Sequence, residues 1–193
     1  METFPQQHAR TRRFTVGSPR SFVIAPITHS ISYLQSSSRS DPSNKLWIHD
    51  PESQTSTVLA DPDHLKVLGE QYEISEEERT RRERVREVGS GIVAFSCSAE
   101  SSIITFTSEG TLYTVNAESK EINDFVTTGS VFDPRINPNG DLISYVSDGD
   151  LRYVDSSGND LLVAGSEDPN ITYGVADFIA AEEMGRRRGH WWS

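Results

Sequence analysis

Short runs of β-branched and aromatic residues alternate with polar turns along most of the chain, and this pattern predicts a mainly β fold. Stretches such as IITF at 103–106 and LISYV at 142–146 lead into tight turns that contain Gly, Ser and Asp. Short apolar runs bounded by such turn residues are typical of strands. Apolar positions at helical spacing are scarce, so helices are expected only locally.

The strand pattern repeats between residues 91–129 and residues 130–168. Equivalent positions are 39 residues apart, as Phe106 and Tyr145 illustrate. A looser copy covers about residues 14–62, where SISYL and LWIHD flank a polar loop. A repeat of about 40 residues with several short strands is typical of a propeller blade. The repeat therefore predicts a partial β-propeller of about three blades.

A β-sandwich is the alternative, because it also consists of short strands separated by regular turns. The fixed offset between the repeats favours the propeller. Three blades do not close a ring, since propellers typically have about four to eight. Open sheet edges are pairing and aggregation hazards, so we expect this chain to be an incomplete propeller.

Two segments break the strand pattern, and the first is a highly charged stretch at residues 75–88. Ser75 and Glu78 have the spacing of a capping box, and Glu78 precedes Arg82 by four residues, as in favourable helical ion pairs. We predict a helix here. Its apolar face is thin, which places the helix at the surface or across a cavity.

The second segment predicts a short helix near residues 175–184. Val175, Phe178 and Ile179 have the i, i+3, i+4 spacing of one helix face, and we expect this apolar side to pack inward. Gly185 is a natural stop for the helix.

Glu182 and Glu183, at the end of this second helix, are the main candidates for a binding function. Two neighbouring carboxylates disfavour mutual ionisation unless a cation lies between them. A protonated α-amino group is such a cation, and its N–H groups can donate to both. The other interpretation is a solvated helix end, because adjacent glutamates are common and a match this short is weak evidence.

The arginine-rich helix offers a second candidate. Arg79, Arg82 and Arg86 share one face by their i, i+3, i+7 spacing. One of these guanidinium groups could bind a peptide carbonyl or carboxylate. The alternative is a solvated face of mixed charge, whose ion pairs contribute little to stability.

Composition removes several classes of function. The formal net charge is −11 over 193 residues, so nucleic acid is a poor partner. With Cys97 as the single cysteine, and no helical His pair, we expect no metal and no cofactor. There is no G-x-S-x-G nucleophile elbow, so no catalytic residue is assigned. Without a signal-peptide pattern or an apolar run of about 20 residues, we expect a cytoplasmic protein that does not bind membranes.

Together these segments resemble the N-terminal region of the dipeptidyl peptidase IV family, in the prolyl oligopeptidase superfamily. The stretch GVADFIAAEEMGRRRGHWWS at 174–193 resembles the family's double-Glu segment. SEEERTRRERVREVGSGIVAF at 75–95 is similar to its Arg-rich helix before a blade. ARTRRFTVGSPRSFVIAP at 9–26 and LWIHDPESQTSTVLADP at 46–62 resemble its opening blade.

The resemblance implies an eight-bladed propeller that caps an α/β-hydrolase domain, and a serine peptidase that removes N-terminal dipeptides with Pro or Ala in the second position. It implies that Glu182 and Glu183 bind the ammonium group of a peptide with a free N-terminus. It also implies that one helix arginine contacts the peptide, with Arg82 and Arg86 as the candidates.

The sequence stops at Ser193, within a turn of the WWSPDG type, and lacks the Ser-Asp-His domain. We therefore expect the substrate-recognition part of a dipeptidyl peptidase, inactive alone, with a missing C-terminal hydrolase domain as its partner. The alternative is a free-standing, propeller-like module that binds a protein or peptide through its loops and open blade edges.

Overall fold

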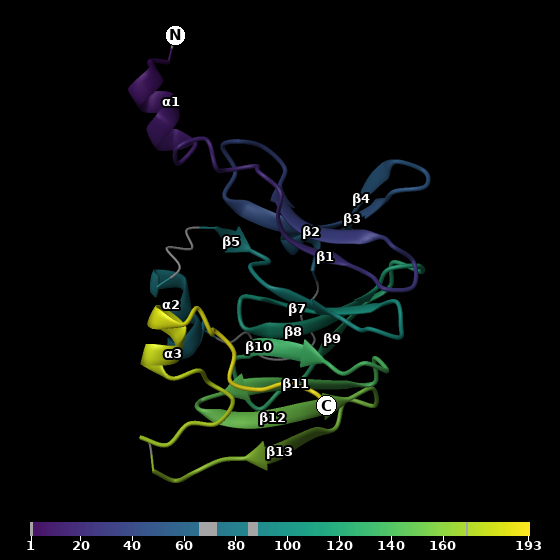
Figure 1. Ribbon diagram of the computed structural model, residues 1–193, viewed down its shortest axis with the longest axis vertical. Helices are drawn as coiled ribbons and strands as arrows, with labels where there is room; N and C mark the ends of the chain where they lie inside the picture. The colour runs from purple at the N-terminus through teal and green to yellow at the C-terminus, as the bar shows by residue number, and fades with distance from the viewer. Residues whose placement is uncertain (1, 66–72, 85–88, 169) are drawn as a thin grey trace. The chain divides into compact units, whose positions relative to one another are not determined.

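The computed structural model of the protein describes residues 2–65, 73–84, 89–168 and 170–193. Within these residues the chain is mainly β, with three antiparallel four-stranded meanders and a few short helices (Figure 1). It divides into two compact units. The first consists of residues 1–65 and 88–94, and the second of residues 66–87 and 95–193.

The first unit contains one meander, in the strand order β1-β2-β3-β4. The short strand β5 adds to it by pairing in parallel with the start of β3. Gly91 in β5 has a φ of +70°, and a Cβ there would lie 2.7 Å from the carbonyl oxygen of Asn44, so this contact requires glycine. The elements of this unit are α1 (Phe4–Arg10), β1 (Arg20–Ile24), β2 (Ile31–Ser36), β3 (Ser43–Asp50), β4 (Thr55–Ala60), the 3-10 helix η1 (Pro62–His64) and β5 (Ser90–Gly91).

The second unit contains the other two meanders, in the orders β6-β7-β8-β9 and β10-β11-β12-β13, and two short helices. Its elements are α2 (Glu76–Arg84), β6 (Phe95–Cys97), β7 (Ile103–Ser108), β8 (Thr111–Asn116), β9 (Ile122–Phe125), β10 (Phe132–Ile136), β11 (Leu142–Ser147), β12 (Asp150–Asp155), β13 (Asp160–Ala164) and α3 (Phe178–Glu183).

The two meanders of the second unit repeat one another in register. Phe106 pairs with Tyr113 across β7 and β8, and the positions 39 residues later, Tyr145 and Arg152, pair across β11 and β12. Both Phe106 and Tyr145 are fully buried. Because a slip of one residue would turn every side chain to the other face, this shared register places the same face of each meander in the core.

The tight turns of the two meanders also correspond. Glu109 and Gly110 have φ values of +50° and +80°, and Asp148 and Gly149 have values of +49° and +81°. Positive φ at both central residues is the requirement of a two-residue type I′ hairpin, whose twist matches that of the flanking strands. The repeat seen in the sequence is therefore a repeat of local backbone geometry.

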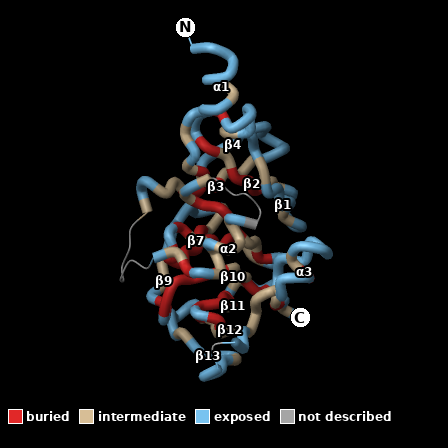
Figure 2. Tube along the Cα trace, turned by 90° about the vertical axis from the view of Figure 1, so that its left-hand side faces the viewer, coloured by how far each residue is buried: buried red, intermediate tan, exposed pale blue. Residues whose placement is uncertain are grey.

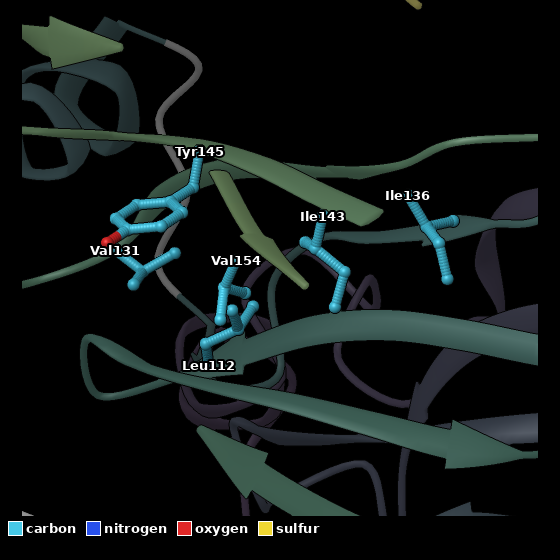
Figure 3. Close-up of a cluster of buried hydrophobic side chains, with 6 residues drawn as sticks. All are labelled: Leu112, Val131, Ile136, Ile143, Tyr145 and Val154. Atoms are coloured by element: carbon cyan, nitrogen blue, oxygen red, sulfur yellow. The ribbon is translucent and has the colours of Figure 1, made fainter. Parts of the chain in front are cut away.

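A hydrophobic cluster joins the two meanders of the second unit (Figure 3). Figure 2 shows buried residues concentrated along the inner strands, whereas β13 and α3 are largely exposed. The buried members of the cluster are Leu112, Val131, Ile136, Ile143, Tyr145 and Val154. The blade-like sheets thus pack face against face, and the predicted partial β-propeller is confirmed.

Both predicted helices are present, and the second is shorter than predicted. α2 covers Glu76–Arg84 of the predicted 75–88, and residues 85–88 lie outside the described part of the chain. α3 covers only Phe178–Glu183 of the predicted 175–184. The helix α1 was not predicted from the sequence.

Candidate functional site

The helix that carries the double-Glu motif is held at both ends by local hydrogen bonds. Asp177 precedes it, and its carboxylate accepts a hydrogen bond of 3.0 Å from the N–H of Ala180. This capping bond starts the helix at Phe178, three residues after the predicted start at residue 175. At the other end, Gly185 has a φ of +63°, and the N–H of Arg186 donates to the carbonyl of Ala180 at 2.9 Å. Gly185 therefore ends the helix as predicted.

The prediction that the apolar side of this helix packs inward was wrong. Phe178 and Ile179 are both 64% exposed, and Ala180 is the buried residue of the helix. Val175 lies before the helix starts, so it does not share a helical face with the other two. The small Ala180 takes the inward position of this helix.

The segment that contains α3 is a loop whose two ends meet. Gly174 and Gly189 approach so closely that a Cβ on Gly189 would lie 2.2 Å from the carbonyl carbon of Gly174. The Nδ1 of His190 also lies 3.3 Å from the carbonyl oxygen of Gly174. Because a carbonyl only accepts, Nδ1 is the donor in this bond. Glu182 and Glu183 are therefore carried on a closed loop with a fixed base.

The Arg-rich helix α2 is stabilised by its own charges. The N–H of Glu78 donates to the Ser75 hydroxyl at 3.3 Å, which is the capping bond that the sequence predicted. The Glu78 carboxylate accepts two hydrogen bonds of 2.7 Å from Arg81 and one of 2.7 Å from Arg82. Burial alone would raise the pKa of Glu78, but the two guanidinium groups outweigh it and lower that pKa.

A cavity of about 260 Å³ lies between α2 and the loop that carries α3, which run side by side in the second unit (Figure 1). A cavity of this size suits one or two residues of a peptide better than a large ligand. Its polar wall consists of Glu76, Glu77, Thr80 and Arg81 from α2 and of Glu182 and Arg187 from the loop.

Apolar side chains complete the cavity. Phe132, at the start of β10, is buried beneath it, and Val175 and Phe178 line it from the loop. Carboxylates and guanidinium groups thus face the same space as aromatic rings. Such a lining can bind a cationic group and a carbonyl at once, while burying an apolar side chain.

The sequence-predicted site residues take different positions around this cavity. Both glutamates are exposed at the end of α3, and of the two Glu182 lines the cavity. Arg82 is bound to Glu78 through its Nε at 2.7 Å. Arg86 lies outside the described residues. The structure therefore brings Glu182 to α2.

Among the described side chains of α2, Arg81 is the arginine that lines the cavity, and it was not among the residues predicted from the sequence. Arg81 shares a helical face with Glu77 and Thr80, at i, i+3 and i+4 spacing. The two charges of opposite sign on this face were the available signal. Arginine spacing alone selects a different face, that of Arg79, Arg82 and Arg86.

The aromatic end of the loop contacts the neighbouring meander and a charged side chain. The guanidinium carbon of Arg186 lies 4.9 Å from the ring centroid of Trp191, which is itself largely exposed. The Nε1 of Trp192 donates to the carbonyl of Arg135 in β10 at 2.8 Å. This last bond attaches the C-terminal part of the loop to β10, the first strand of its meander.

The described residues contain no group of three or more His, Cys, Asp or Glu side chains that could hold a metal ion. None of their helices has both the length and the apolar character that a membrane crossing requires.

Residues 90–193 match the family described as "Dipeptidyl peptidase IV (DPP IV) N-terminal region", which is more than half of the chain. Among solved structures, a similar one is the tricorn protease, with a TM-score of 0.50 and 11% identity, covering 77% of this chain and 13% of that chain. A chain of a nidogen/laminin complex is similar with a TM-score of 0.46 and 12% identity, covering 76% of this chain and 46% of that one. At this identity the likeness to the tricorn protease concerns the fold alone, and this chain spans less than two thirds of either structure.

Proposed function

We propose, because this chain belongs to the dipeptidyl peptidase IV N-terminal region family, that the cavity beside Glu182 binds the free N-terminus of a peptide. The observation that carries the proposal is the presence of Glu182 and Arg81 on one cavity of about 260 Å³, although they are far apart in the sequence. The chain is then the substrate-recognition part of a serine dipeptidyl-peptidase.

The chemistry of the cavity supports a peptide end as the ligand. An ammonium group needs acceptors, and the Glu182 carboxylate provides them in a charge-assisted form. The Arg81 guanidinium provides donors for the first peptide carbonyl, and Glu78 holds it in place. Phe132 and Phe178 offer apolar surface for the first side chain.

The remaining candidate residues have more limited support. Glu183 adjoins Glu182 at the exposed end of α3, and we propose it as a second carboxylate for the same ammonium group. Arg82 shares the Glu78 carboxylate with Arg81, so it is held beside the cavity. Contact of Arg82 or Arg86 with the peptide stays a prediction.

Calorimetric titration with a short peptide amide, such as Ala-Pro-Ala-amide, tests this assignment. Glu182→Gln and Arg81→Gln are each expected to weaken binding by about tenfold or more, because each removes a charge-assisted hydrogen bond. Glu167→Gln, at an exposed position outside the cavity, makes the same charge change as Glu182→Gln and is the control. Equal affinity of all variants, with unchanged circular dichroism spectra, would contradict the proposal.

We further propose that the chain binds peptide without hydrolysing it. The sequence has no G-x-S-x-G elbow to present a serine nucleophile. Hydrolysis would then depend on a separate hydrolase domain as partner. A cytoplasmic location is part of the same proposal, and it agrees with the single Cys97, which cannot form an internal disulfide.

A further inference from the structure

A second cavity, of about 160 Å³, lies where three segments of the second unit meet. Ser96 and Cys97 reach it from β6, and Arg135 reaches it from β10. Ser96 and Arg135 are equivalent positions of the 39-residue repeat. The third segment is 188–192, attached to β10 by the Trp192 bond described above. This cavity shares no lining residue with the cavity beside Glu182.

Positive charge gathers around this second cavity. Arg135, Arg188 and His190 all line it. Asp133 is ion-paired with Arg135 through an Nη2–Oδ1 contact, and it supplies the nearby negative charge. Among the described residues, the Nε of Arg135 is buried without a hydrogen-bond partner. A buried donor without a partner destabilises the protein, and an acceptor that entered the cavity would offset this cost.

His190 provides another unsatisfied atom, in addition to the Oδ2 of Asp133, which is also buried without a partner within the described residues. Its side chain belongs to a residue that is only 9% exposed, and its Nε2 has no partner within the described chain. Since Nδ1 donates to the Gly174 carbonyl, Nε2 carries the lone pair when the ring is neutral. Burial lowers the pKa of His190 and outweighs the Gly174 hydrogen bond and the charge of Asp133, which raise it; the charges of Arg135 and Arg188 lower it further. The ring therefore resists protonation until a negative charge enters.

We propose that this cavity binds a small oxyanion, a carboxylate or sulfate-like group, through Arg135, Arg188 and the Nε2 of His190. Planar guanidinium groups match the geometry of such oxygens. A water molecule occupies about 30 Å³ in the liquid. The cavity of about 160 Å³ therefore has room for a small polyatomic ion but not for a peptide of several residues. The proposal does not rest on the peptide-binding function.

The site couples anion binding to proton uptake. A neutral His190 would present a lone pair to the anion, whereas a protonated ring presents an N–H donor. The charged or titratable groups that face His190 are Asp133 and Arg135 from β10, Arg188 from its own segment, and the Cys97 thiol of β6, which lines the same cavity. Because the bound state holds the extra proton, oxyanion affinity falls as pH rises.

Calorimetric titration of the 193-residue chain with sodium sulfate or sodium acetate, at constant ionic strength with chloride, tests the proposal. We expect saturable binding that weakens as the pH rises from about 5 to about 8, because the lowered pKa of His190 places the start of this loss below the ordinary histidine value of about 6.5. Sulfate does not change its own protonation in this range, so any proton uptake belongs to the protein. Binding of both ions assigns the site to oxyanions in general, and binding of sulfate alone assigns it to tetrahedral ones.

Two variants locate the site. Arg188→Gln should weaken sulfate binding by about tenfold through loss of a charge-assisted contact. Arg187→Gln makes the same charge change one residue away, on the other cavity, and should bind as the wild type does. His190→Gln should bind with little pH dependence. Absence of saturable binding, or equal weakening by Arg187→Gln and Arg188→Gln, would overturn the proposal.

Discussion

Gly174 and Gly189 are in backbone contact, and this contact closes the loop that carries the double-Glu motif. A Cβ on Gly189 would lie 2.3 Å from the carbonyl oxygen of Gly174 and 2.5 Å from the N–H nitrogen of Val175. No side chain can occupy that space, because all of the atoms it would meet belong to the backbone. The position of Glu182 thus depends on two glycines outside α3.

Gly189→Ala is expected to lower the free energy of unfolding by about 3 kcal/mol, since overpacking against fixed backbone forces the loop open. Gly185→Ala is the matched control in the same loop. An added Cβ there meets nothing within 4 Å, so only its φ of +63° is unfavourable, at about 1 kcal/mol. Chemical denaturation measures both, and equal losses would contradict the account.

The packing between the two meanders of the second unit depends on Leu112. This side chain is fully buried in the cluster of Figure 3. Leu112→Ala should lower the free energy of unfolding by about 3 kcal/mol, because the removed methyl groups leave a cavity. Leu161→Ala, on the exposed strand β13, removes the same atoms and should cost much less. Similar losses for the two variants would argue against a core between these sheets.

Asp160 attaches β13 to the linker before β10. Its carboxylate accepts hydrogen bonds from the N–H and hydroxyl of Thr128, at 2.8 and 2.5 Å, and from the Nε of Arg152 at 3.1 Å. Asp160→Asn would replace one carboxylate oxygen with an NH2 group, which cannot accept hydrogen bonds from these donors. We expect it to lower the free energy of unfolding near neutral pH by about 2 kcal/mol, because hydrogen bonds to a charged group are lost from a partly buried ion pair.

The same aspartate makes the stability of the second unit depend on pH. Burial by itself would raise the pKa of Asp160, but its hydrogen bonds with Thr128 and Arg152 outweigh burial and lower it. A lowered pKa contributes stability above the unfolded value of about 3.9, and this contribution is lost as pH falls toward the folded value. The difference between wild type and Asp160→Asn should therefore narrow below about pH 4. A constant difference down to pH 3 would contradict this assignment.

The fold followed from the sequence because its signals are local. The strand runs and the Gly-containing turns at Gly110 and Gly149 each appear within a few residues, and the 39-residue repeat shows the same local pattern twice. The helix α1 also had a local signal that was overlooked, since Thr3 and Gln6 form a capping box in which the Thr3 N–H donates to Gln6 at 2.8 Å.

The cavity beside Glu182 was harder to predict, because two distant segments build it. Spacing alone could place Arg79, Arg81 and Arg82 on particular faces of α2, but it could not identify the face turned to the loop. Phe178 shows the same limit. Its apolar character predicted burial, whereas the short helix leaves it exposed at the cavity wall.

The proposal that the chain binds without hydrolysing has a direct consequence. Incubation of the purified chain with Ala-Pro-p-nitroanilide should release no p-nitroaniline above the rate of the uncatalysed reaction, because no serine nucleophile is presented. Absorbance at high protein concentration measures this. Turnover that purifies together with the chain and persists at constant specific activity would contradict the proposal.

The central claim is that the cavity beside Glu182 recognises a free peptide N-terminus. The most direct measurement is calorimetric titration of the wild-type chain with Ala-Pro-Ala-amide and with the same peptide acetylated at its N-terminus. Acetylation removes the positive charge of the terminal ammonium group and two of its three N–H donors, and it leaves the rest of the peptide unchanged. We predict that the free amine binds at least about tenfold more tightly, as expected for loss of a charge-assisted interaction. Equal affinities, or binding of neither peptide, would contradict the account.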